Sequence, residues 1–298
     1  MNSQHRVSPR GGSGNSVLRR IGQVTEEPGR IAYAMISDSV SRPSSSSIQS
    51  PPPVGTPELS IDGVPRLSNR PVPGSRLAAA LWDFDGTLAD TEPIWIAAEY
   101  ELIPRLGGEW NEEHAHKLVG GSLLESGAYM AGVIGRDDLR PEWIVDQLLQ
   151  VVIDFCRRGP IPWRPGAREL LESLRLAGVP CALVSASYRS LLDVIIEQLP
   201  AGSFQASVAG DEVSHGKPHP EPYLSACRQL GVRPDDCVVF EDSPPGAKSG
   251  GDAGATVVVI ENVVPVPTAP RQVRVGSLAE LDAASVARLL PRDGDDED

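Results

Sequence analysis

From residue 77 onward, short apolar runs alternate with longer segments whose apolar residues recur every three or four positions. Five runs have the length and composition of strands buried on both faces, which is typical of parallel sheets. They cover residues 76–84, 179–187, 204–210, 236–243 and 255–262. The pattern predicts five parallel strands.

Helical patterns connect these runs. Residues 166–178, 188–199 and 219–231 each place apolar side chains on one helical face, and Gly178 and Gly231 stand where a glycine ends a helix. Strands and helices that alternate through short links favour an α/β fold. We therefore expect a Rossmann-like, doubly wound parallel sheet.

One long segment, 93–163, interrupts the alternation, because it contains helical patterns and no convincing strand. Ile144, Leu148 and Val152, for example, form a stripe at helical spacing. The segment is too long for a single crossover. We predict an inserted α-helical cap domain over 93–163 and an α/β core formed by 77–92 and 164–292.

The two ends of the chain differ from the rest in composition and lack its hydrophobic periodicity. Residues 1–76 are rich in Ser, Pro and Arg and lack hydrophobic periodicity, which predicts a disordered extension. An organelle transit peptide is the alternative, and the many prolines and the weak amphipathic pattern disfavour it. Residues 293–298 hold five acids and are expected to form a solvated acidic tail.

Composition narrows the possible functions. The net charge of −13 over 298 residues argues against nucleic-acid binding, which requires a basic face. No apolar run approaches the roughly 20 residues that cross a bilayer, and no membrane association is expected. Four cysteines lie far apart without a C-x-x-C motif, which is typical of reduced thiols. We expect a cytoplasmic protein, and a monomer.

Unusual polar residues follow several predicted strands. Asp83 and Asp85 end the first strand, Ser185 follows the second, and Glu241 and Asp242 end a later one. In an open α/β sheet, ligands bind beyond the carboxyl ends of the strands. Acids gathered there repel one another without a cation, and Mg²⁺ suits carboxylate and phosphate oxygens. Taken alone, the Asp242 segment would be interpreted as a helix N-cap.

These segments resemble the four motifs of the haloacid dehalogenase-like (HAD) hydrolase superfamily. The stretch "DFDGTLADTEP" is similar to the first motif, D-x-D-x-T, and "VFEDSPPGA" to the fourth, while Ser185 and Lys217 match the second and third. The helical insertion is similar to the C1 cap of this superfamily. The stretch "GDEVSHGKPHPEPY" resembles its phosphoglucomutase-like branch.

The resemblance implies catalytic roles. Asp83 would be the nucleophile that forms an aspartyl-phosphate, and Asp85 would protonate the leaving oxygen and later deprotonate water. Thr87 and Ser185 would donate hydrogen bonds to aspartate or phosphate oxygens. Lys217 would supply positive charge to the phosphate and the acids.

The resemblance also implies a Mg²⁺ cofactor. Asp83, the backbone carbonyl of Asp85, and Asp242 would hold the ion. Glu241 would either bind it directly or support the residues that do.

The cap is expected to determine the substrate, a small phosphorylated metabolite that fits beneath a closing lid. The candidate contacts are Lys117, Gly120, Gly121 and Ser122 in "HKLVGGSLLES", together with Ala186 beyond the second strand. The paired glycines would let backbone amides approach the ligand.

Three functions remain open: a Mg²⁺-dependent phosphatase, a sugar-phosphate mutase of the β-phosphoglucomutase type, and a non-catalytic binding protein on the same fold. The phosphatase is preferred over the mutase because Leu123 and Leu124 stand where related mutases place a basic residue. The binding protein would be expected to lack a motif residue, and none is missing.

Three further interpretations favour structure over chemistry. Ser187 is interpreted only as an N-cap of the helix at 188–199, and His215 and His219 as structural loop residues. Adjacent Gly250 and Gly251 predict a weak helix after the fourth motif, since each glycine costs about 1 kcal/mol relative to alanine.

Overall fold

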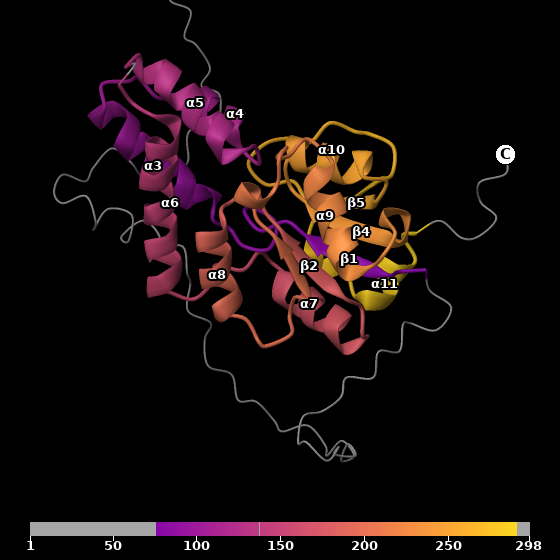
Figure 1. The fold of residues 1–298 in the computed structure, drawn as a ribbon. Coiled ribbons are helices and arrows are strands. Elements are labelled where there is room, and N and C mark those ends of the chain that lie inside the picture. Colours follow the sequence, from indigo (N-terminus) through magenta and orange to yellow (C-terminus); the bar gives the residue numbers. More distant parts are fainter. Residues whose placement is uncertain (1–75, 137, 291–298) are drawn as a thin grey trace, which may run out of the picture. The chain divides into compact units, whose positions relative to one another are not determined.

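A parallel sheet of six strands forms the centre of the computed structural model, which describes residues 76–136 and 138–290 (Figure 1). Its order is β3-β2-β1-β4-β5-β6. The strands are β1 (Ala79–Trp82), β2 (Cys181–Val184), β3 (Ala206–Val208), β4 (Cys237–Glu241), β5 (Thr256–Val259) and β6 (Gln272–Arg274). The predicted doubly wound parallel sheet is confirmed, and each of the five predicted runs contains a strand.

The sixth strand was not predicted. β6 lies at the edge of the sheet beside β5, has only three residues, and none of them is fully buried. A short edge strand of this kind needs no continuous apolar run, so its sequence carries no strand signal.

The register brings the predicted motif residues to one edge. Trp82 at the end of β1 pairs with Leu183 of β2 and with Phe240 of β4. The backbone N–H of Asp83 continues the ladder by donating to the carbonyl of Phe240, at 3.1 Å. The residues that follow β1, β2 and β4 therefore leave the sheet at the same level.

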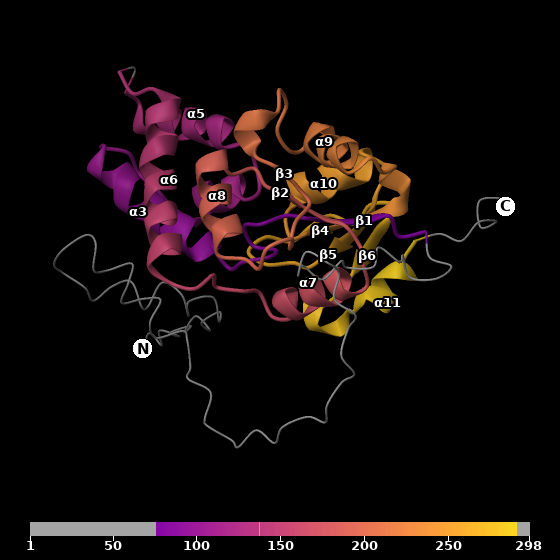
Figure 2. The ribbon, with the colours of Figure 1, turned by 60° about the horizontal axis from the view of Figure 1, so that its bottom comes forward.

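Helices cover both faces of the sheet (Figure 2). On one side lie α7 (Ala167–Leu176) and α11 (Ala283–Ala287); on the other lie α9 (Glu221–Leu230) and α10 (Pro244–Asp252). The helix α8 (Arg189–Glu197) packs against α6 (Pro141–Arg158) of the inserted segment. This two-sided cover explains why strands β1, β2, β4 and β5 are buried throughout.

The expectation of a weak α10 overlooked the packing of its glycines. The buried face of α10 consists of small residues, and a Cβ added at Gly250 would lie 2.9 Å from Cγ1 of Val239 in β4. Gly250 thus lets the helix lie close to the sheet, which offsets part of its cost in helix propensity.

Four helices stand between β1 and α7 (Figure 1). They are α3 (Glu92–Arg105), α4 (Glu112–Leu118), α5 (Leu123–Ile134) and α6 (Pro141–Arg158). The stripe predicted on α6 is buried, and α6 packs against α3, α5 and α8. The range predicted for the cap, 93–163, encloses these helices except for the first residue of α3.

The extension predicted for residues 1–76, apart from Arg76, and the tail predicted for 293–298 lie outside the described residues. All four cysteines are buried and free of disulfides. Within the described ranges, no helix combines the length and the apolar character that spanning a membrane requires.

Candidate active site

Lys217 lies at the centre of the acidic sheet edge and is 2% exposed. Its Nζ donates to Oδ1 of Asp83 and to Oε1 of Glu241, both at 2.6 Å, and to the carbonyl of Val184 at 3.1 Å. All three ammonium donors are therefore used. Burial acts to lower the pKa of Lys217, but attraction by Asp83 and Glu241 outweighs it and leaves the pKa above its ordinary value. The lysine stays charged and holds two carboxylates.

Glu241, the last residue of β4, has both carboxylate oxygens occupied. Besides Lys217, Oε1 accepts from the Tyr223 hydroxyl at 2.7 Å. Oε2 accepts from the Ser243 hydroxyl at 3.0 Å and from the backbone N–H groups of Asp242 and Ser243. Five donors satisfy the four lone-pair positions of this carboxylate, so no oxygen of Glu241 faces the site without a partner.

Asp83 and Asp242 differ from Glu241, because each keeps one buried oxygen without a partner. In the described part of the chain, neither Oδ2 of Asp83 nor Oδ2 of Asp242 finds a hydrogen-bond donor. Oδ1 of Asp242 accepts from the Thr87 hydroxyl at 3.1 Å. One carboxylate oxygen from each of Asp83, Glu241 and Asp242 lies within 4.8 Å of the other two.

Electrostatics in this cluster favour a bound cation. Burial raises the pKa of Asp83 to about 8, although Lys217 acts in the opposite direction. Burial and repulsion by Asp83 hold the pKa of Asp242 well above its ordinary range. A hard divalent cation would satisfy both unpartnered oxygens and keep both groups ionised, which is the donor set that Mg²⁺ prefers. The residues present therefore fit a magnesium ion.

The turn after β1 depends on a glycine. Gly86 has a φ of +85°, and a Cβ at this position would lie 2.0 Å from Oδ2 of Asp242. A side chain here would both strain the backbone and displace the carboxylate that completes the acidic cluster.

The side chain of Asp85 joins the core to the inserted helices. Its Oδ1 accepts from the Thr91 hydroxyl at 2.7 Å and from Nε1 of Trp95 in α3 at 2.8 Å. Its Oδ2 accepts from the hydroxyls of Ser187, at 2.7 Å, and Ser185, at 3.3 Å. Four neutral donors thus hold a carboxylate at the boundary between the sheet edge and the cap.

The interpretation of Ser187 as only an N-cap was wrong. The N-cap of α8 is Tyr188, while the Ser187 hydroxyl donates to Asp85. Nε1 of Trp95 in α3 also donates to Asp85. No sequence pattern connects these residues with Asp85, since they lie on separate elements.

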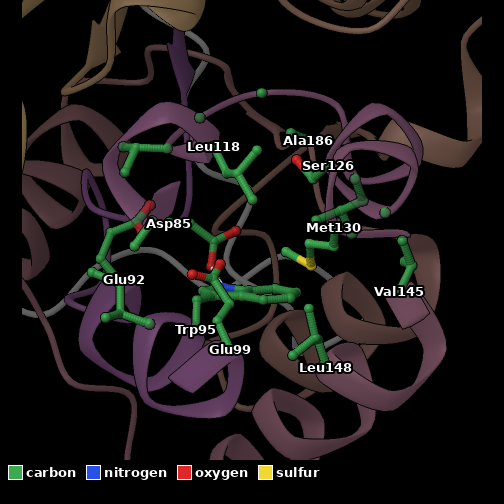
Figure 3. Close-up of a pocket in the computed structure, with 17 residues that line it drawn as sticks. Asp85, Glu92, Trp95, Glu99, Leu118, Ser126, Met130, Val145, Leu148 and Ala186 are labelled. Atoms are coloured by element: carbon green, nitrogen blue, oxygen red, sulfur yellow. Dashed lines mark hydrogen bonds between the residues drawn. The ribbon is translucent and has the colours of Figure 1, made fainter. Parts of the chain in front are cut away.

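A pocket opens between Asp85 and the inserted helices (Figure 3). It encloses about 60 Å³, and α3, α5 and α6 form most of its wall. Of the residues predicted to contact substrate, the structure brings Gly120, Gly121 and Ala186 to this pocket beside Asp85.

The other two predicted contacts lie elsewhere. Lys117 is exposed, with Nζ 4.2 Å above the ring of Tyr129. Ser122 is the N-cap residue of α5 and lines a separate cavity that includes Gly216. The structure therefore does not bring a cation from the glycine-containing loop into the pocket.

Two acids of α3 that line the pocket were not predicted from the sequence. Glu92 and Glu99 are 5% and 6% exposed, and both face the same pocket as Trp95 (Figure 3). Positions 92, 95 and 99 have helical i, i+3, i+7 spacing and so share one face. That spacing was the available signal, since an acid on the same face as an inward-pointing tryptophan is also directed inward.

Comparison with known proteins points to one family. A family model described as haloacid dehalogenase-like hydrolase matches residues 80–260, which is more than half of the chain. Hexitol phosphatase B of Escherichia coli (strain K12) is 27% identical over 226 residues, covering 73% of this chain and 96% of that protein. The structure of CbbY from Rhodobacter sphaeroides in complex with phosphate is 27% identical, with a TM-score of 0.61, covering 68% of this chain and 96% of that one.

A further relative is longer. The bifunctional riboflavin kinase/FMN phosphatase of Arabidopsis thaliana is 30% identical over 207 residues. The match covers 68% of this chain and 52% of that protein, so the chain spans about half the length of this relative.

Proposed function

Because this chain belongs to the haloacid dehalogenase-like hydrolase family, we propose that it is a Mg²⁺-dependent phosphatase that hydrolyses a small phosphate monoester through an aspartyl-phosphate. The observation that carries the proposal is the environment of Asp83. One of its oxygens is fixed by Lys217 at 2.6 Å, and the other is buried without a partner in the described part of the chain.

Asp83 attacks the phosphorus atom, and the bond to the ester oxygen breaks as the bond to Asp83 forms. Asp85 gives its proton to the departing alcohol and then takes a proton from the water that hydrolyses the aspartyl-phosphate. Inorganic phosphate leaves, and both aspartates return to their initial state. Ser185 and Ser187, which hold Asp85, orient it for both proton transfers.

Asp83 and Asp242 would hold Mg²⁺ through the oxygens that lack donors, together with the backbone carbonyl of Asp85. The ion supplies charge neutralisation to the transferring phosphoryl group. Lys217 adds a fixed positive charge beside the nucleophile, and Glu241 positions this lysine rather than binding the ion. Thr87 orients Asp242 through its hydroxyl.

The substrate is proposed to be a small sugar or polyol phosphate. Support comes from the pocket, which lies between the sheet edge and the helices α3, α4, α5 and α6, and from the hexitol phosphatase among the relatives. Our expectations that the protein is monomeric, cytoplasmic and without affinity for nucleic acid stay predictions.

A mutase that uses the same aspartyl-phosphate is the alternative function. A mutase must also bind the phosphate group that does not react, and this requires a cation in the cap. Leu123 lines the pocket and Leu124 is 45% exposed, while Lys117 stacks on Tyr129 outside it. These placements favour hydrolysis over phosphate migration.

The proposal is tested with the purified chain, Mg²⁺ and a set of sugar and polyol monophosphates, with phosphate and isomers followed by ³¹P NMR. We expect free phosphate from the active chain, and none from a folded Asp83→Asn variant, because the isosteric amide cannot attack phosphorus. Turnover by Asp83→Asn above a few per cent would refute the mechanism. An isomer that accumulates with a bisphosphate primer, with little free phosphate, would establish the mutase instead.

A further inference from the structure

We propose that Glu92 and Glu99 form a subsite that binds the hydroxyl groups of a neutral leaving alcohol and excludes alcohols that carry a second anionic group. The proposal rests on the proposed phosphatase function, which it deepens by assigning a substrate class. Both residues belong to α3, and neither takes part in the chemistry at Asp83.

Glu92 is directed into the pocket without a partner. It is 5% exposed and lines the pocket, yet it makes no hydrogen bond or ion pair with any residue in 76–136 or 138–290 (Figure 3). The side chain is largely buried and its carboxyl group is open to the pocket, where a bound donor would supply the hydrogen bonds that the protein does not. Because Glu92 lines the pocket beside Asp85 and does not lie deep in the core, we expect a group of the substrate to be that donor.

Glu99 lies two helical turns further along α3 on the same face. Its Oε2 accepts one hydrogen bond, from Nε1 of Trp110 at 3.3 Å, and no donor in the described chain reaches Oε1. The side chain is 6% exposed and lines the same pocket. The two glutamates therefore present several open acceptor positions along one wall, with the indole of Trp95 between them.

The remaining lining determines which ligand fits. The described residues around the pocket include three acids, Asp85, Glu92 and Glu99, and no lysine, arginine or histidine. A phosphate or carboxylate at the far end of the substrate would be buried among acids without a counter-charge, which is strongly unfavourable. The hydroxyl groups of a sugar or polyol would instead donate to the open acceptors.

The ionisation of the two glutamates agrees with a neutral ligand. Burial raises the pKa of Glu99 to about 8, although the hydrogen bond from Trp110 acts against the rise. Burial, followed by repulsion from Asp85 and Glu99, holds the pKa of Glu92 well above its ordinary value. A protonated carboxyl both donates and accepts, which suits hydroxyl groups.

The test compares two ligands that differ at one end. Sorbitol 6-phosphate ends in a hydroxyl group, whereas gluconate 6-phosphate ends in a carboxylate. Binding is measured by calorimetry with Mg²⁺ on the full-length Asp83→Asn chain, which cannot turn the ligands over. The same ligands, together with acetyl phosphate, which has no polyol end, serve as substrates of the chain with Asp83 intact.

We expect sorbitol 6-phosphate to bind at least tenfold more tightly than gluconate 6-phosphate. Glu92→Gln and Glu99→Gln should each reduce this preference by roughly three- to tenfold, as expected for the loss of one well-placed hydrogen bond. In the active chain, the change should appear in KM for sorbitol 6-phosphate. Glu101→Gln, on the exposed side of α3, is the matched control and should change neither quantity.

Equal binding of the two ligands, or a preference that both glutamine variants leave intact, would overturn the subsite. Selective binding without hydrolysis of any ester would leave the subsite standing and refute the phosphatase function. Hydrolysis of acetyl phosphate without selective binding would refute the subsite and leave the phosphatase function standing.

Discussion

Replacing Lys217 by methionine tests whether this lysine holds the acidic sheet edge together. Methionine keeps the length and the apolar character of the lysine stem and removes the ammonium group. Lys217 contacts Asp83 and Glu241 at 2.6 Å each, and all three side chains are buried. The variant therefore leaves two buried carboxylates without their shared counter-charge.

The size of the effect follows from that geometry. Removing one partner of a buried ion pair costs about 3–5 kcal/mol. Domains have a free energy of unfolding of about 5–15 kcal/mol, so this loss is a large fraction of the total. For 150–250 residues, each kcal/mol lowers Tm by roughly 2–4 °C, which gives a decrease of roughly 6–20 °C.

Urea unfolding in the presence of EDTA measures this loss without compensation from a metal ion. Lys248→Met is the control, since Lys248 is an exposed lysine paired with Asp252, and it should cost at most about 1 kcal/mol. The double variant Lys217→Met/Glu241→Gln should recover part of the stability, because only Asp83 then lacks a counter-charge, but none of the activity. A Lys217→Met variant within about 1 kcal/mol of the parent protein would contradict the ion-pair assignment.

Three other substitutions test separate features. Gly86→Ala should lower kcat/KM by roughly 100-fold in a steady-state assay, because its Cβ would displace Asp242; normal turnover would contradict the tight turn. Gly251→Ala, where a Cβ meets open space, should raise the free energy of unfolding by about 0.4–1 kcal/mol. Gly250→Ala should lower it by about 1–3 kcal/mol, so equal effects of the two would refute the close packing of α10. Glu99→Gln should leave the free energy of unfolding unchanged at pH 4 and raise it increasingly, relative to the parent protein, from pH 5 to 8. In this range the raised pKa keeps Glu99 protonated in the folded state, whereas Glu99 ionises in the unfolded state and so destabilises the fold of the parent protein. If urea titrations show that the free energies of unfolding of Glu99→Gln and the parent protein change in parallel with pH, the raised pKa of Glu99 is excluded.

The core of the candidate site could be predicted because strand ends are determined by topology. An apolar run that ends in a polar residue places that residue at the carboxyl edge of a parallel sheet, whatever the details of packing. Asp83 and Asp242 follow this rule, and the ladder bond from Asp83 to Phe240 shows how the register aligns β1 with β4. The position of Lys217 could be predicted only from the family resemblance, since this residue lies on a loop whose course the sequence pattern does not define.

Contacts between separate elements could not be predicted. Ser187 has the composition of a helix cap, and only its distance of 2.7 Å from Asp85, across from β1, shows that it holds the carboxylate. Gly250 lowers helix propensity locally, and its benefit appears only where α10 meets Val239. In both cases a local preference pointed one way and a contact distant in sequence decided the outcome.

The two glutamates of α3 show the same limit in the pocket that we propose selects the substrate. Charged residues at helical spacing usually lie on a solvated face, and within α3 only the face that they share with Trp95 indicates an inward direction. The face of Glu92 and Glu99 is buried because α5 and α6 pack around the pocket, and helix crossing depends on complementary side-chain ridges rather than on any single segment. Under the proposed function, the reaction depends on short motifs at strand ends, whereas the selection of the leaving alcohol depends on how the inserted helices meet. Relatives that keep the motifs would then differ in substrate through this packing, and the charges on the α3 face are the property to compare among them.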